Sequence, residues 1–227
     1  MLERIIRILS AFESERPTLS VATLANRAEV PVPTCYRLVN QMIQAQLLRK
    51  DESGNIGLGM RLWELASRSS PALDLRKAAM PFLDDVQSVF RQHTQLSVIE
   101  GDEVLVLERL SSRNSVVNLA HIASRMPIHP EAADYTYPET GNINSTLANV
   151  RQHGYAQLEG LIDEDTTGAA VPVFAALDGR DRKKVIAAIG VVVPRNFEQR
   201  NALIPVLLAA SRGLTRSISG QEPQIYH

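Results

Sequence analysis

Side chains that can read DNA bases gather on one face of residues 30–44. At helical period the stretch places four apolar or weakly polar side chains on one stripe, which are Cys35, Leu38, Val39 and Met42. The opposite face carries a hydroxyl, amides and one guanidinium but no carboxylate, in the form of Thr34, Arg37, Asn40, Gln41 and Gln44. Amides and guanidinium pair with adenine and guanine edges in the major groove. The stretch is therefore a candidate DNA-reading helix, although the solvated face of an ordinary helix has similar polarity.

Two short helices and a hairpin surround this stretch in the order of a winged helix-turn-helix. We expect an amphipathic helix over residues 2–12 and a second helix over 19–28, with Ser20 as its N-cap. A tight turn over 29–32 leads into the reading helix. After it, turn residues over 51–55 separate two short strands, which predicts a wing. Three helices followed by a wing, in this order, indicate a winged helix-turn-helix more specifically than any one of these elements does.

Candidate DNA contacts follow from this arrangement. Basic and amide side chains on a wing can reach phosphates or the minor groove, although the hairpin could also be a purely structural flap. The candidates are Ser20, Thr34, Tyr36, Arg37, Asn40 and Gln41 on the two helices, and Arg49, Lys50 and Asn55 on the wing.

Composition limits the classes of protein that remain. The 227 residues are 44% hydrophobic, enough for one large or two modest domains with real cores. The net charge is −1, but residues 20–50 contain four basic side chains and one acidic one, a local bias that suits a DNA-contacting face. The single cysteine excludes an internal disulfide. With no secretory signal and no membrane-length apolar run, we expect a cytoplasmic protein that does not enter membranes.

The second half alternates expected strands and helices, which indicates an α+β domain with an antiparallel sheet and flanking helices. A helix over residues 60–69 ends before Pro71, where we place the domain boundary. Pro81 should kink the long helix that follows. The remaining expected elements are helices over 72–94, 142–154 and 197–219, and strands over 95–100, 103–109, 116–122, 169–175 and 185–193.

No catalytic constellation emerges from the residues. The five histidines lack metal-ligand spacing, and no nucleophile elbow, P-loop or Rossmann glycine pattern is present. The acidic run at residues 163–165 is more typical of a solvated loop than of a metal site. We therefore predict no catalytic residue, metal or cofactor. Two other classes stay open: a small-molecule-processing enzyme with an accessory helical domain, and a winged-helix protein-interaction module without DNA binding.

Ordered motifs run through most of the chain. In the first half they are Leu19-Ser20, Ala25, Pro31, Thr34, Arg37-Leu38 and Leu58-Gly59. In the second half they are residues 76–108, then 125–129 (R-M-P-I-H), 150–156 (V-R-Q-H-G-Y-A) and 170–173 (A-V-P-V). This series resembles the isocitrate lyase regulator (IclR) family of bacterial transcription regulators.

The resemblance implies a domain order and partners. Residues 1–59 would form a winged helix-turn-helix domain, 60–71 a linker helix, and 72–222 a GAF-like effector-binding domain. The protein would be a repressor or activator that binds double-stranded operator DNA as a homodimer, or as a dimer of dimers, because symmetric dimers match palindromic half-sites. A small-molecule effector would shift the balance between dimer arrangements.

The resemblance also implies effector contacts, carried over position by position. These are Leu119, Ile122, Met126, His129, Glu159, Gly168, Ala170, Gly190 and Val192. Many members have serines at the positions of Gly190 and Val192, and those hydroxyls bind a carboxylate. Each lost charge-assisted hydrogen bond is worth about 1.5–3 kcal/mol. We therefore expect a larger, more apolar effector than glyoxylate or pyruvate, such as an aromatic acid.

Two departures from the family pattern stand out. The family usually has glycine where this chain has Glu29, and often a basic residue and a serine where it has Val32 and Pro33. Because glutamate does not readily adopt positive φ, we expect this turn to be shaped differently. After His129 the family continues into a G-K-A-L-L-A helix that is absent here, so either the protein lacks this helix or the sequence as given omits it.

Overall fold

The structure, a computed structural model, divides the chain into two compact units, Met1–Ser70 and Pro71–His227. Each unit has its own hydrophobic core. Most of the strand expected over 116–122, with Leu119, lies outside the residues that the structure describes, as do His129 and the segment after it. The described residues are 1–13, 16–68, 70–113, 115, 122–127, 143–160, 163–176 and 183–219.

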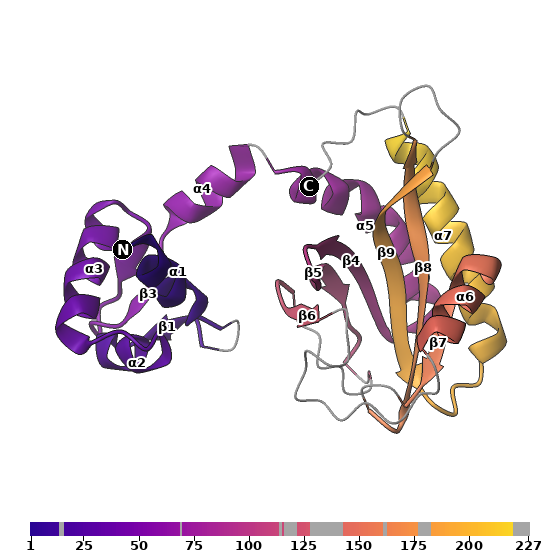
Figure 1. Cartoon of the computed structure of the whole chain (residues 1–227), viewed down its shortest axis with the longest axis horizontal. Coiled ribbons are helices and arrows are strands. Elements are labelled where there is room, and N and C mark those ends of the chain that lie inside the picture. Colours follow the sequence, from indigo (N-terminus) through magenta and orange to yellow (C-terminus); the bar gives the residue numbers. More distant parts are fainter. Residues whose placement is uncertain are drawn as a thin grey trace. The chain divides into compact units, whose positions relative to one another are not determined.

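The first unit is a three-helix domain with a small sheet and one further helix (Figure 1). The wing strands β2 and β3 pair in antiparallel fashion, and β1 adds to the other edge of β3. The expected wing is therefore present. The elements are α1 (Leu2–Ser10), β1 (Thr18–Leu19), α2 (Val21–Arg27), α3 (Val32–Gln44), β2 (Leu48–Lys50), β3 (Ile56–Leu58) and α4 (Met60–Arg68).

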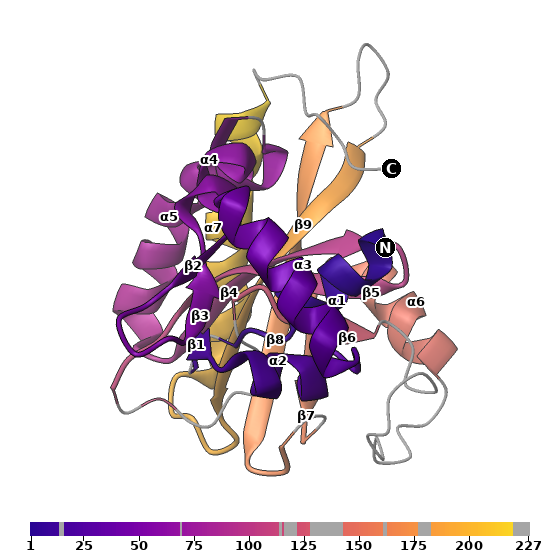
Figure 2. The same cartoon turned by 90° about the vertical axis from the view of Figure 1, so that its left-hand side faces the viewer.

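The stripe expected on the reading helix is the buried face of α3. Cys35 and Leu38 are fully buried, and Val39 and Met42 are almost so. They share a core with Ile8 of α1 and with α2, which lies beside α3 (Figure 2). Burial of this stripe leaves the polar face of α3 to solvent.

The second helix starts later than expected. Ser20 is its N-cap, as predicted, and its Oγ accepts a hydrogen bond from the Thr23 amide at 3.1 Å. Leu19, however, lies in β1, where it pairs with Ile56 of β3. The helical pattern alone could not exclude Leu19, because its strand partner is 37 positions further along the chain.

The turn at Glu29 is not differently shaped, so that expectation from the sequence was wrong. Its φ is +52°, in the left-handed region that glycine favours. The Val30 amide bonds to Ala25 O at 2.9 Å and the Glu29 amide to Asn26 O at 3.2 Å, which together close α2 with a Schellman motif. The turn keeps the glycine-type geometry because these two bonds and the burial of Val30 impose it.

Replacing Glu29 by glycine should stabilise the first unit by about 0.5–1 kcal/mol, because relief of the left-handed strain outweighs the backbone entropy added to the unfolded chain. The Arg7 ion pair lost in the change, at 3.7 Å, involves an exposed carboxylate and contributes little. The measurement is thermal or urea unfolding followed by the fluorescence of Trp63. Glu29→Gln is the matched control, since it removes the charge but keeps the strain. An equal gain in both variants would contradict the assignment to backbone strain.

The second unit is an antiparallel six-stranded sheet in the order β6-β5-β4-β9-β8-β7, with helices packed on it (Figure 1). This confirms the α+β class expected from the sequence. The elements are α5 (Pro71–Phe90), β4 (His93–Glu100), β5 (Glu103–Leu110), β6 (Arg125–Pro127), α6 (Ile143–His153), β7 (Ala156–Glu159), β8 (Thr166–Ala176), β9 (Lys183–Pro194), the 3-10 helix η2 (Arg200–Ala202) and α7 (Leu203–Ile218).

Helix boundaries in this unit differ from the expected ones at two places. The long helix continues through Pro81 but stops at Phe90, and Arg91 has a φ of +53°. His93 and Thr94 therefore belong to β4, where they pair with β9. The last helix starts at Leu203, after η2, not at residue 197.

The core of the second unit lies between the sheet and helices α5 and α7. α5 packs on β4 and β5, and α7 packs on β8 and β9. Leu83 and Val86 of α5 meet Leu207 and Leu214 of α7 in one cluster with the inward residues of the strands. We call this side of the sheet the helix face. The opposite side, defined by Gln95, Gly168 and Gly190, is called the second face.

A buried charge pair ties α5 to the sheet. Glu108 of β5 is 3% exposed and lies opposite Leu96, on the helix face. One of its carboxylate oxygens forms an ion pair with Arg76 of α5, and the other accepts a hydrogen bond from the Arg109 amide at 2.9 Å. Removing the partner of a buried charge costs free energy of folding, so we expect loss of either side chain's partner here to destabilise the second unit.

Candidate functional site

The polar face of α3 presents the side chains expected to read DNA. Tyr36 is 51% exposed, and Arg37, Asn40 and Gln41 are exposed along the same face. Thr34 is half-buried at the start of the helix. Within the described part of the chain, Arg37 forms no ion pair that would hold it back from a base or phosphate. The candidate residues on this face thus offer one cation, two amides and two hydroxyl groups to a groove.

The wing adds two cations to this unit. Arg49 and Lys50 are exposed on β2, and neither is in an ion pair within the described residues. Asn55 is half-buried, and its backbone N–H donates to Asp51 Oδ1 at 2.8 Å, which helps to close the hairpin. Ser20 is exposed, but its hydroxyl already serves the N-cap of α2. As exposed cations, Arg49 and Lys50 are therefore the stronger candidates for phosphate contacts.

The second face brings four expected effector residues together. In the register of the sheet, Gly168 of β8 lies opposite Val192 of β9, and Ala170 lies opposite Gly190. Directly paired residues of an antiparallel sheet project from the same face. Their neighbours Ala169, Val171, Ile189 and Val191 are buried on the helix face. Gly168, Ala170, Gly190 and Val192 thus form one patch.

Other expected effector residues are less central or lie elsewhere. Met126 is opposite Val104, which is opposite Ile99, so it projects from the same second face at the end of the β4–β5 hairpin. Ile122 is 49% exposed in the turn before β6. Leu119 and His129 fall outside the described residues. The register therefore groups five of the nine candidates on one face.

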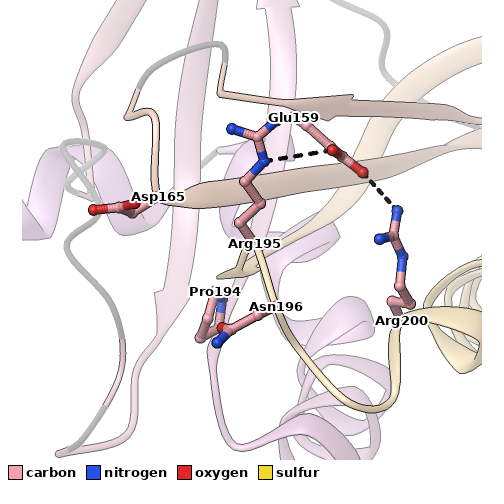
Figure 3. Close-up of a pocket in the computed structure, with 6 residues that line it drawn as sticks. All are labelled: Glu159, Asp165, Pro194, Arg195, Asn196 and Arg200. Carbon is pink, nitrogen blue, oxygen red and sulfur yellow. Dashed lines mark hydrogen bonds and ion pairs between the residues drawn. The ribbon is translucent and has the colours of Figure 1, made fainter.

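Glu159 is separated from this patch. It pairs with Thr167, one residue out of phase with Gly168, and so projects from the helix face. Its carboxylate is bridged by Arg200 Nη2 at 2.5 Å and Arg195 Nε at 3.6 Å (Figure 3). The three side chains line an open pocket of about 660 Å³, together with Asp165, Pro194 and Asn196. The structure thus gives Glu159 two arginine partners outside the second face.

Arg125 of the R-M-P-I-H motif forms ion pairs with two glutamates of the sheet. Its guanidinium pairs with Glu100 and, at 3.1 Å, with Glu103, at the end of the β4–β5 hairpin. The hydrogen bond to Glu100, and to a smaller extent the one to Glu103, raises the pKa of the Arg125 guanidinium. The arginine therefore fastens β6 to the hairpin.

Sequence reasoning missed a polar stripe on β4. His93, Gln95 and Ser97 alternate with Thr94, Leu96 and Val98, and they pair with Val192, Gly190 and Ala188 on the second face. His93 and Ser97 are 6% and 7% exposed, so they are buried polar groups on a central strand. Arg109 of β5 lies opposite Gln95. The only signal in the sequence was this alternation, which the solvated face of an antiparallel strand also shows, so the burial of His93 and Ser97 became visible only in the structure.

The described residues contain no group of potential metal ligands, and their one cysteine is buried. No cluster of three or more potential ligands occurs in the part of the chain that the structure describes. Burial raises the pKa of the Cys35 thiol, which stays protonated inside the core of the first unit. Nor is any described helix long and apolar enough to cross a membrane.

Comparison with known proteins decides the family. A model of the IclR helix-turn-helix domain matches residues 1–52, and a model of the C-terminal domain of bacterial transcriptional regulator IclR matches residues 68–134. A crystal structure of an IclR homolog complexed with 4-hydroxybenzoate, from Microbacterium hydrocarbonoxydans, is 33% identical. The match covers 97% of this chain and 99% of that one, with a TM-score of 0.84. This chain belongs to the IclR family.

More distant IclR-family relatives also align over nearly the whole chain. The Pca regulon regulatory protein of Pseudomonas putida is 21% identical over 96% of this chain and 84% of its own length. The regulator RhmR of Escherichia coli K12 is 22% identical over 98% of this chain and 94% of its own. IclR-family proteins bind DNA through the helix-turn-helix, and the relatives are transcriptional regulators. The chain is thus a DNA-binding transcriptional regulator.

Proposed function

We propose that this regulator binds operator DNA through α3 and the β2–β3 wing, and that a small aromatic acid bound by the second unit controls that binding. The first half of the proposal rests on the polar face of α3, whose cation and amides are exposed and suited to base edges. We assign DNA binding to residues 1–59, the joining role to 60–71 and effector binding to 72–222. Bound to DNA, the protein acts in the cytoplasm and has no catalytic role.

The aromatic acid is supported by a relative and by the second face. The Microbacterium homolog was crystallised with 4-hydroxybenzoate. In this chain Gly168, Ala170, Gly190 and Val192 present small or apolar surface without hydroxyl groups, which suits a flat ring better than a small, highly polar acid. Met126 and Ile122, with Leu119 and His129, complete the proposed contact set, while Glu159 is left out because its arginine pairs occupy it on the other face.

We further propose a homodimer, or a dimer of two dimers, as the DNA-binding form. One reading helix per half-site gives limited affinity, and two related by symmetry match a palindromic operator. A ligand must bind one dimer arrangement better than another to change DNA affinity.

A single assay tests this function. Fluorescence anisotropy would measure binding to the DNA upstream of the regulator's own gene, from about 50 to 200 mM salt, with and without 4-hydroxybenzoate. We expect affinity to fall steeply with salt, by roughly 10³-fold if six or more phosphates are contacted, and to change on addition of the aromatic acid. Pyruvate and glyoxylate serve as controls. An effect of these small acids with none from 4-hydroxybenzoate would overturn the effector class, and salt-independent binding would overturn the DNA-binding mode.

A further inference from the structure

The second face divides into a polar half and an apolar half. Across the sheet, one row of paired residues runs from Arg109 of β5 through Gln95, Gly190 and Ala170 to Ala156 of β7. The groups capable of charge-assisted hydrogen bonds are at the β5 end of the row. The other end is a floor of small side chains, extended by Gly168 and Val192 in the adjacent row.

Gln95 borders the floor. A Cβ built on Gly190, which is itself buried, would lie 3.7 Å from Gln95 Cγ, so the glutamine side chain lies beside the floor at Gly190. At Gly168, by contrast, a Cβ would meet nothing within 4 Å among the described residues. Among the described residues, the floor is therefore open at Gly168 and bordered by the Gln95 side chain next to Gly190.

The size of this surface suits one aromatic ring. Neighbouring strands are about 4.8 Å apart, so Gln95 and Ala170, two strands apart, are separated by about 10 Å. A ring resting on Gly190 and Ala170 would direct a carboxylate substituent toward Gln95 and Arg109. Gly190 and Val192 themselves offer that carboxylate no side-chain donor.

We infer that Arg109, assisted by Gln95, is the specificity-determining residue that recognises the carboxylate of an aromatic acid whose ring lies on the Gly168, Ala170 and Gly190 floor. This rests on the proposed effector function and deepens it. The guanidinium supplies a charge-assisted, bidentate hydrogen bond that a neutral ligand cannot use fully.

Calorimetry on the full-length protein tests the charge recognition with two isosteric probes, 4-hydroxybenzoate and 4-hydroxybenzamide. We expect the unchanged protein to prefer the acid by about tenfold or more. Arg109→Met should remove that preference while leaving amide binding within about twofold, and Arg109→Lys should restore part of it. The control is Arg212→Met, the same substitution at an exposed position of α7, which should change neither affinity.

The outcomes separate the inference from the function on which it rests. Retention of the acid preference in a folded Arg109→Met protein would overturn the inference and leave the aromatic effector intact. Failure of the unchanged protein to bind either probe would overturn both the role of Arg109 and the proposed aromatic effector. If Arg109→Met does not fold, Gln95→Leu replaces it, with a loss of about threefold or more in the acid preference as the expected result and an unchanged preference as the contrary one.

The floor is tested separately by Gly168→Val. The backbone of Gly168 is not in the left-handed region, and the site of its Cβ is open among the described residues, so valine, which favours strands, should preserve the fold. We expect it to occupy the space of the ring and weaken binding of both probes by about tenfold or more. Unchanged binding of both probes to this variant would show that the ring does not lie on this floor.

Discussion

Replacing Arg37 by alanine is expected to weaken operator binding by roughly 100-fold in a dimer. A bidentate arginine contact to guanine is worth about 1–3 kcal/mol per half-site, and the dimer loses two of them. Arg37 is exposed at the centre of the polar face of α3, and within the described residues no ion pair competes for its guanidinium. The measurement is fluorescence anisotropy at constant salt with operator DNA and with a scrambled duplex.

Two comparisons make this result specific. Lys50→Ala on the wing should weaken both duplexes alike and reduce the slope of log affinity against log salt by about two in a dimer, about one for each protomer. Arg37→Ala should instead lower affinity for the operator more than for the scrambled duplex. Arg212→Ala, on α7 in the other unit, is the charge-matched control and should have little effect. Equal operator affinity in Arg37→Ala and the unchanged protein would favour the protein-interaction module over a DNA reader.

Replacing Arg76 by methionine is expected to destabilise the second unit by about 3 kcal/mol. The change leaves the Glu108 carboxylate, 3% exposed, without the cation that compensates its burial. Breaking a buried pair typically costs about 3–5 kcal/mol. We take the low end because the Arg76 side chain is 42% exposed and solvent already screens it. The denaturant dependence of hydrogen exchange at the β4 and β5 amides measures the loss within this unit.

The neighbouring residue provides a matched control. Lys77 also lies on α5, but its side chain is 74% exposed and its nearest carboxylate, Asp74, is 3.9 Å away. Lys77→Met should therefore change stability by less than about 0.5 kcal/mol. The double variant Arg76→Met with Glu108→Leu should recover much of the lost stability, because no buried charge remains. A double variant as unstable as Arg76→Met alone would place the cost in packing and not in the unpaired carboxylate.

Local periodicity and turn chemistry made part of this protein predictable from its sequence. The stripe from Cys35 to Met42, the N-cap at Ser20, the wing and the β4–β5 hairpin were all predicted, because each is encoded within a few turns or strands of chain. The polar face of α3 follows from the same helical period. The DNA half of the candidate site could therefore be located from the sequence, whereas its individual contacts remain predictions.

The face of the sheet that each side chain occupies depends on tertiary structure. A strand has a period of two, so a shift of one residue in register moves its side chains to the other face, and the register is set by partners distant in the sequence. β4 pairs with β9, about 95 positions later, which places Gln95 beside Gly190 and His93 beside Val192. The same pairing rules separate Glu159 from Gly168. The polar stripe on β4, with Arg109 next to it, becomes a candidate site only when strands β5, β4, β9 and β8 lie side by side.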